Sequence, residues 1–157
     1  MPNWRIPIAV RPKLREELAR LELLGVIEAV DEPTPWASQV VVTLKKNGKL
    51  RLCIDPRELK KALLRENYVL PILEDTLHEL RHSTVFSKAD LSFAYWHVLL
   101  DEESIQLTTF QTCFGRYKCL RLLYGLSVSA EIYGKKLLEA IHDLLGVVCI
   151  ADDLVIQ

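Results

Sequence analysis

Two adjacent carboxylates stand between two apolar runs in the stretch Cys149-Ile150-Ala151-Asp152-Asp153-Leu154-Val155-Ile156-Gln157. The runs 147–150 and 154–156 are short and rich in β-branched residues, which is typical of strands. The Ala-Asp-Asp between them then forms the tip of a tight hairpin. Asp is a good turn residue, and turn chemistry alone can explain the pair. Alternatively, the strands hold two like charges together with a cation between them, and the hairpin is half of a divalent-metal site.

A further carboxylate, Asp90, ends the strand-like run 85–89 and is followed by Leu91. A two-metal site needs carboxylates from separate elements that converge on cations about 3.5–4 Å apart. Asp90 is the best candidate for the second element of such a site. An Asp at a strand end is also common in plain turns, so both interpretations stand at this point.

Composition places the chain among globular proteins of one-domain size. Of its 157 residues, 50% are hydrophobic and 26% are charged, which allows a substantial core. The cysteines Cys53, Cys113, Cys119 and Cys149 form no C-x-x-C pair, and we interpret them as reduced, buried thiols. No signal peptide and no apolar run of membrane-spanning length is present. These features predict an intracellular protein that makes no membrane contact.

Charge is unevenly distributed along the chain. The net charge is −1, so there is no global basic field that attracts a polyanion. Residues 45–65, however, carry a local excess of +6. This strip fits contact with phosphate groups, and it equally fits a solvated protein face.

Apolar periodicity and turn signals give the expected elements. Helices are expected at 13–24, 57–64, 74–81 and 129–145, the last with Ser129 as its N-cap. Strands are expected at 40–44, 50–54, 85–91, 107–111, 117–122, 147–150 and 154–156. Asn47-Gly48 between the first two strands is a strong hairpin signal. The irregular alternation with hairpins predicts an α+β fold with an antiparallel sheet.

One competing motif is His78-Glu79-Leu80-Arg81-His82, which fits the H-E-x-x-H pattern of zinc hydrolases. That spacing puts both imidazoles on one helix face. A third ligand has to come from His97, His142 or a downstream Glu, and none is convincingly placed. A five-residue pattern with two free positions arises often by chance, so zinc hydrolysis is the distant alternative.

Several short boxes follow one another in the order found in one known family. They are 24–28, 35–41, the basic box 45–59, 68–71, 86–91, 108–117, 124–126 and Ile150-Ala151-Asp152-Asp153. Together they resemble the reverse transcriptase of long-terminal-repeat retrotransposons of the Ty3/gypsy type. One box is a weak signal, but several in order are very specific. The resemblance implies a right-hand polymerase fold, with helices packed on one face of the sheet.

The resemblance implies a catalytic role for three aspartates. Asp90, Asp152 and Asp153 would form the carboxylate triad, with the backbone carbonyl of Leu91 also facing a metal. Two Mg²⁺ ions, or Mn²⁺, would activate a primer 3′-hydroxyl and neutralise the leaving pyrophosphate. The implied partners are an RNA or DNA template, a DNA primer and a deoxynucleoside triphosphate.

Further roles are carried over to matching positions. Lys45 or Lys46 and Arg51 would hold the triphosphate, and Tyr95 would lie under the sugar and exclude a 2′-hydroxyl. Tyr124 and Gly125 would touch the nucleotide or template. The residues expected to contact nucleic acid along the basic strip are Arg57, Lys60 and Lys61.

The resemblance also implies a division of the chain. Residues 1–84 and 106–122 would form fingers, and residues 85–105 and 123–157 would form palm with the Asp-Asp hairpin. Family members continue into further palm, a thumb and often RNase H, so these 157 residues alone are expected to be inactive. Segment 123–134 departs from the family pattern. A catalytically silent remnant that only binds nucleic acid therefore remains an alternative.

Overall fold

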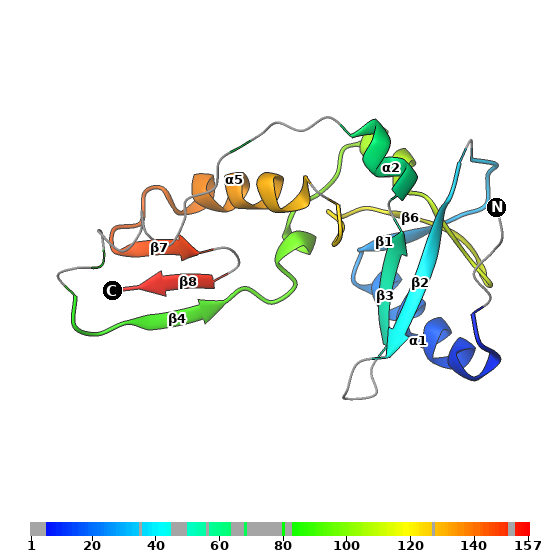
Figure 1. Ribbon diagram of the computed structural model, residues 1–157, viewed down its shortest axis with the longest axis horizontal. Helices are drawn as coiled ribbons and strands as arrows, with labels where there is room; N and C mark the ends of the chain where they lie inside the picture. The colour runs from blue at the N-terminus through cyan, green and yellow to red at the C-terminus, as the bar shows by residue number, and fades with distance from the viewer. Residues whose placement is uncertain are drawn as a thin grey trace. The chain divides into compact units, whose positions relative to one another are not determined.

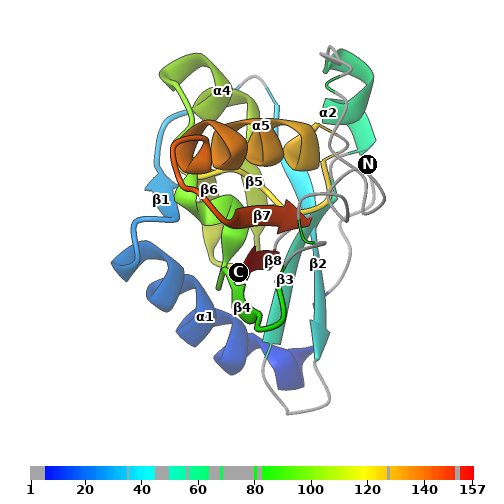
Figure 2. The same ribbon diagram turned by 90° about the vertical axis from the view of Figure 1, so that its left-hand side faces the viewer.

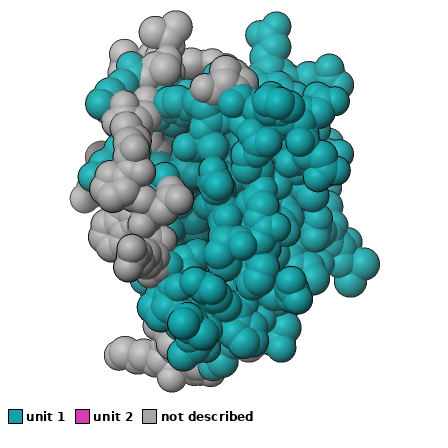
Figure 3. Space-filling model, turned by 90° about the vertical axis from the view of Figure 1, so that its right-hand side faces the viewer, with its two compact units in different colours: residues 1–63, 99–126 teal, residues 64–98, 127–157 magenta. Residues whose placement is uncertain are grey.

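The computed structural model describes residues 6–34, 36–44, 50–55, 57–63, 68, 80, 83–126, 128–150 and 153–157. The chain forms two compact units. Unit 1 comprises residues 1–63 and 99–126, and unit 2 comprises residues 64–98 and 127–157. Figure 1 shows the elements of both, and the surface of unit 1 fills the view in Figure 3. Each unit has its own sheet.

Helix α1 (Arg11–Leu23) of unit 1 confirms the helix expected at 13–24. Pro12 lies in its first turn, where a missing N–H costs no hydrogen bond. Leu14, Leu18 and Leu21 recur at helical spacing and are buried. Helix α1 contacts strands β1 (Ile27–Val30) and β3 (Leu50–Asp55) of the same unit. Gly25 has φ 63° just past the helix, a conformation that glycine adopts without strain.

The sheet of unit 1 has the order β1-β6-β5-β2-β3. Its strands are β1 (Ile27–Val30), β2 (Ser38–Leu44), β3 (Leu50–Asp55), β5 (Phe110–Thr112) and β6 (Gly115–Cys119). The expected hairpin of β2 and β3 is confirmed, although its Asn47-Gly48 turn lies outside the described residues. Strands β2 and β5 run parallel, so the sheet is mixed, where the sequence pattern predicts antiparallel pairing only.

Among its described residues, unit 1 also has two short α-helices, of which the sequence predicts one and not the other. Helix α2 (Arg57–Ala62) confirms the helix expected at 57–64. Helix α4 (Glu102–Leu107) occupies a segment where no helix is expected, and Leu107 belongs to it and not to a strand. The strand expected at 107–111 therefore begins only at Phe110. The physical reason is a local cap: the Asp101 carboxylate accepts from the Ser104 backbone N–H at 2.7 Å and starts a helix there.

Unit 2 contains an antiparallel sheet of order β4-β8-β7. Its strands are β4 (Ser87–Asp90), β7 (Val147–Ile150) and β8 (Asp153–Ile156). The C-terminal hairpin is confirmed, because β7 and β8 pair in antiparallel register. Helix α5 (Ser129–Ile141) lies along β7 in both views (Figures 1 and 2). The helix expected at 74–81 lies outside the described residues, except Leu80, which is in a turn.

The N-cap of helix α5 differs from the sequence prediction. Ser129 is not the N-cap of α5: the cap position is Val128, and no side-chain cap hydrogen bond forms. Ser129 is instead the first helical residue and is fully buried. Tyr133 and Gly134 are buried on the same helix.

The cysteines are all free thiols, but they differ in exposure. Cys119 and Cys149 are buried, as expected, and Cys53 is half-buried. The expectation is wrong for Cys113, which is exposed in the turn between β5 and β6. No helix in the described part of the chain combines the length and apolar composition needed to cross a bilayer.

Candidate functional site

Asp90 and Asp153 are direct partners across two neighbouring strands of unit 2. In the β4–β8 register, Asp90 pairs with Asp153, and Asp153 pairs in turn with Ile150 of β7. Asp153 therefore begins the central strand of the sheet, with Asp90 at the end of the edge strand beside it. Directly opposed residues of an antiparallel pair have Cβ atoms about 4.5–5.5 Å apart, so the two carboxylates share one small region. Asp152 lies outside the described residues.

Lys88 supplies positive charge to this pair of carboxylates. It precedes Asp90 by two positions, so both belong to the same sheet face. Its Nζ lies 2.7 Å from Asp153 Oδ2. The hydrogen bond to Asp153 raises the pKa of Lys88, and attraction by Asp153 and by Asp90 adds to the rise. Both carboxylates therefore act on a cation at this position.

The chain turns sharply after Asp90. Leu91 follows the strand directly, and Phe93 has φ 58°, a left-handed conformation that is uncommon for a bulky residue. The short helix η2 (Ala94–His97) comes next, and its Tyr95 packs edge-on against Tyr133 of α5, with ring centroids 5.4 Å apart. Tyr95 is thereby fixed by helix α5, five residues after Asp90.

The other predicted site residues belong to unit 1. Lys45 and Lys46 lie outside the described residues, as do the side chains of Arg51 and Lys60. The backbone of Arg51 lies in β3, paired with Thr43. Tyr124 is 39% exposed and Gly125 has φ 90°, so the turn here requires a glycine-like conformation.

Arg57 and Lys61 are the two remaining basic residues of the predicted site, and both belong to unit 1. Lys61 is exposed on α2. Arg57 is engaged within the chain, because its guanidinium binds the Asp55 carboxylate through Nη2 at 2.6 Å and Nε at 2.8 Å. A phosphate that binds Arg57 therefore competes with Asp55.

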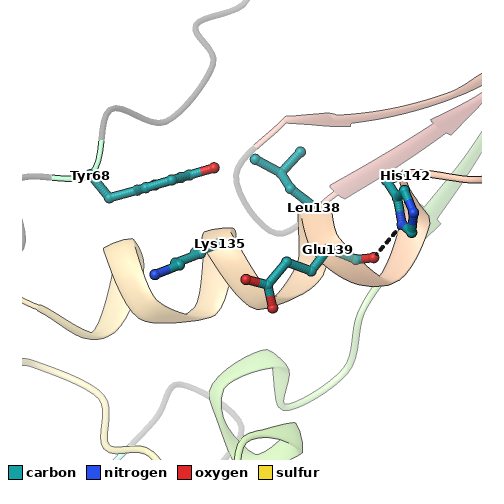
Figure 4. A pocket seen from close by; sticks show the side chains of 5 residues that line it. All are labelled: Tyr68, Lys135, Leu138, Glu139 and His142. Carbon is teal, nitrogen blue, oxygen red and sulfur yellow. Dashed lines mark hydrogen bonds between the residues drawn. The ribbon is translucent and has the colours of Figure 1, made fainter.

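Sequence reasoning missed a groove along α5 with a volume of about 510 Å³. Figure 4 shows the side chains that line it, which are Tyr68, Lys135, Leu138, Glu139 and His142. Lys135, Leu138, Glu139 and His142 recur at i, i+3, i+4 and i+7 along one helix face. This spacing is the sequence signal that could have indicated the groove. The groove contains none of the predicted carboxylates.

Among the described residues, no group of three or more His, Cys, Asp or Glu side chains could hold a metal ion. The opposed pair Asp90 and Asp153 is thus two-thirds of the predicted triad, and Asp152 is its missing member. The zinc-motif residues His78, Glu79 and His82 lie outside the described residues.

Comparison with known proteins gives the family. The model of the family "Reverse transcriptase (RNA-dependent DNA polymerase)" matches residues 43–157. An uncharacterized Caenorhabditis elegans protein is 36% identical over 97% of this chain, and the retrovirus-related Pol polyprotein from the Drosophila melanogaster transposon opus is 26% identical over 98%. The chain spans only 12% and 16% of the lengths of these two relatives.

Solved structures show the same fold. Prototype foamy virus protease-reverse transcriptase matches the whole chain with a TM-score of 0.83 at 19% identity, and the chain covers 21% of that protein. The foamy viral protein in complex with double-stranded DNA matches with a TM-score of 0.85 at 18% identity, and the chain covers 27% of it. The α+β fold is confirmed.

The relatives also indicate which type of retrotransposon the chain resembles. The transposons opus, 412 and 297 are gypsy-type, and their Pol polyproteins match 83–98% of this chain. The resemblance to gypsy-type retrotransposons is thereby confirmed. The chain belongs to the reverse transcriptase family of RNA-directed DNA polymerases.

Proposed function

We propose that this chain is the part of a retroelement Pol polyprotein that carries the catalytic carboxylates for nucleotidyl transfer to a primer 3′-hydroxyl. The observation that supports this most is the register of Asp90 opposite Asp153 on adjacent strands. Both are hard oxygen donors of the kind that Mg²⁺ prefers. The Lys88 ammonium, 2.7 Å from Asp153, supports the proposal that this pair of carboxylates takes positive charge.

The chain's own groups would act as follows. Asp90 and Asp153, with Asp152 from the hairpin tip and the Leu91 carbonyl, would hold two Mg²⁺ or Mn²⁺ ions. When bound, the ions supply the charge that activates the primer hydroxyl and neutralises the leaving pyrophosphate. The carboxylates fix the position of this charge, and rigid strands are well suited to that task.

Nucleotide selection would come from residues near the carboxylates in sequence and from the basic hairpin. Tyr95 would lie under the sugar and exclude a 2′-hydroxyl, and its edge contact with Tyr133 supports a fixed ring position. Lys45, Lys46 and Arg51 would hold the triphosphate, with Tyr124 and Gly125 near the nucleotide or template. Lys61, Lys60 and Arg57 would contact the nucleic-acid backbone.

We propose that fingers and palm segments alternate along the chain, as the two compact units do. Fingers would comprise residues 1–84 and 106–122, and palm residues 85–105 and 123–157. The two compact units also alternate along the chain, which supports such a division, although their boundaries follow residues 63, 98 and 126. Because the chain spans a small share of its relatives, we propose that extension requires further palm and thumb segments and that the full-length protein also carries RNase H.

A primer-extension assay tests this function. The domain is placed in a longer polypeptide of its element and given an RNA template, a DNA primer and Mg²⁺. We expect extension by the parent protein and its loss in Asp153→Asn. Asp143→Asn is the matched control, because Asp143 is an exposed carboxylate of the same unit with no role in the proposed site. Salt-sensitive nucleic-acid binding without extension by the parent would instead indicate the silent remnant.

A further inference from the structure

The contact between Lys88 and Asp153 joins a basic side chain to one of the proposed metal ligands. Lys88 Nζ lies 2.7 Å from Asp153 Oδ2, a distance typical of a charge-assisted hydrogen bond. The Lys88 side chain is 65% exposed, and that of Asp153 is 36% exposed. The pair is thus accessible to solvent and to a dissolved cation.

Repulsion between the Asp90 and Asp153 carboxylates explains what the Lys88 contact does. Like charges directly opposite on antiparallel strands are destabilising. In the metal-free protein the Lys88 ammonium offsets the repulsion between Asp90 and Asp153. A divalent ion bound to the same carboxylates also offsets their repulsion, and it repels an ammonium that lies 2.7 Å from one of its own ligands.

We infer that Lys88 is an internal counter-ion that occupies Asp153 in the metal-free protein and must leave it when a divalent cation binds. This inference rests on the proposed function, since it concerns the same carboxylates. Lys88 is a positioning residue: it contacts a ligand of the metal and not the substrate. Its charge makes metal binding weaker, and its hydrogen bond makes the empty site more stable.

Replacement of Lys88 separates these two effects. Lys88→Met removes the charge and the donor but keeps much of the apolar stem, so Asp153 becomes free to bind metal. Lys88→Arg keeps a cation within reach. Lys136→Met is the matched control, because Lys136 forms an exposed ion pair with Glu139 at 3.0 Å on α5 of the same unit. Lys136→Met changes the net charge of the chain by the same amount, but on α5 instead of β4.

The experiment is a Mn²⁺ titration of the 157-residue chain, with free Mn²⁺ measured by electron paramagnetic resonance. We expect Lys88→Met to bind Mn²⁺ roughly two- to fivefold more tightly than the parent, which corresponds to the loss of one exposed ion pair. Lys88→Arg and Lys136→Met are expected to bind like the parent. Thermal unfolding gives a second result: Lys88→Met has the lower Tm without metal and the larger rise in Tm with Mn²⁺.

Three outcomes overturn the inference. If the parent binds Mn²⁺ and Lys88→Met binds equally or less tightly, Lys88 does not compete with metal and the proposed function stands. If Lys88→Met and Lys136→Met both bind more tightly, net charge and not the contact is responsible. If neither the parent nor Lys88→Met binds Mn²⁺, the inference and the proposed metal site both fail.

Discussion

Asp90 and Asp153 oppose each other in the β4–β8 ladder, and this places two carboxylates from segments 63 residues apart in sequence on neighbouring strands. An ordinary sheet avoids such a pair, because like charges in this position repel. The sheet tolerates it here with Lys88 bound to Asp153. The Lys88 ammonium offsets this repulsion, and we propose that a divalent ion can supply the same positive charge.

Removal of one carboxylate should therefore stabilise the metal-free chain. Asp90→Asn abolishes the repulsion and leaves the Lys88–Asp153 ion pair in place. We expect the Tm of the chain to rise by up to about 3 °C without metal, and the stabilisation by Mn²⁺ to be lost. Thermal unfolding in chelator and in Mn²⁺ measures both. Asp143→Asn serves as control, and an equal rise in that variant would show that the effect is not local.

Helix α1 provides a test of the core of unit 1. Leu14→Ala creates a cavity at a fully buried position, so we expect a loss of about 2–5 kcal/mol in the free energy of unfolding. Leu23→Ala is the control on the same helix, because Leu23 is 89% exposed and its truncation should change stability by less than about 0.5 kcal/mol. Urea denaturation compares them, and equal losses would contradict the burial of Leu14.

The Asp101 cap of α4 should give a pH-dependent contribution to stability. Its hydrogen bonds from the Ser104 backbone N–H and hydroxyl lower the Asp101 pKa below its ordinary value of 3.8. The folded carboxyl then holds its proton less tightly than the unfolded one. The stabilisation is therefore complete above about pH 5 and is lost as the pH falls through the lowered pKa.

Asp101→Asn keeps the capping ability but has no charge to titrate. We expect the parent to lose stability relative to this variant as the pH falls from about 5 to 2. Urea midpoints of both proteins across this range measure the difference. A difference that does not change with pH would show that the Asp101 charge contributes nothing.

The cysteines should react in order of exposure. Cys113 is exposed, whereas Cys119 is buried and its thiol pKa is raised by desolvation, so little thiolate forms there. We expect a thiol reagent at pH 8 to modify Cys113 first and Cys119 only after unfolding. Cys113→Ser should remove the fastest phase. Persistence of that phase in Cys113→Ser would assign it to another thiol.

Local patterns in the sequence were sufficient for several elements. The spacing of Leu14, Leu18 and Leu21 predicts α1, and the apolar runs around Asp152-Asp153 predict the β7–β8 hairpin. Both are local effects of side-chain periodicity. Helix α4 was missed although its signal was present: Asp101 is a capping residue, and Glu102 and Glu103 lie in the first turn.

Long-range pairing could not be predicted from local patterns. Nothing in the residues of β2 and β5 specifies that they run parallel, since pairing depends on how distant segments meet. For the site, Asp90 and Asp153 were identified from their positions at strand ends and from the family boxes, but their direct register could not be predicted. The Lys88–Asp153 ion pair likewise depends on that register.

We propose that Asp90, Asp152 and Asp153 hold the divalent ions for DNA synthesis. RNA-templated extension of a DNA primer tests this role, with the domain in a longer polypeptide of its element and Asp90→Asn beside Asp143→Asn. We expect Mg²⁺-dependent extension that falls by about a hundredfold or more in Asp90→Asn and is unchanged in Asp143→Asn. Extension by Asp90→Asn at the parent rate would show that Asp90 does not hold the ions.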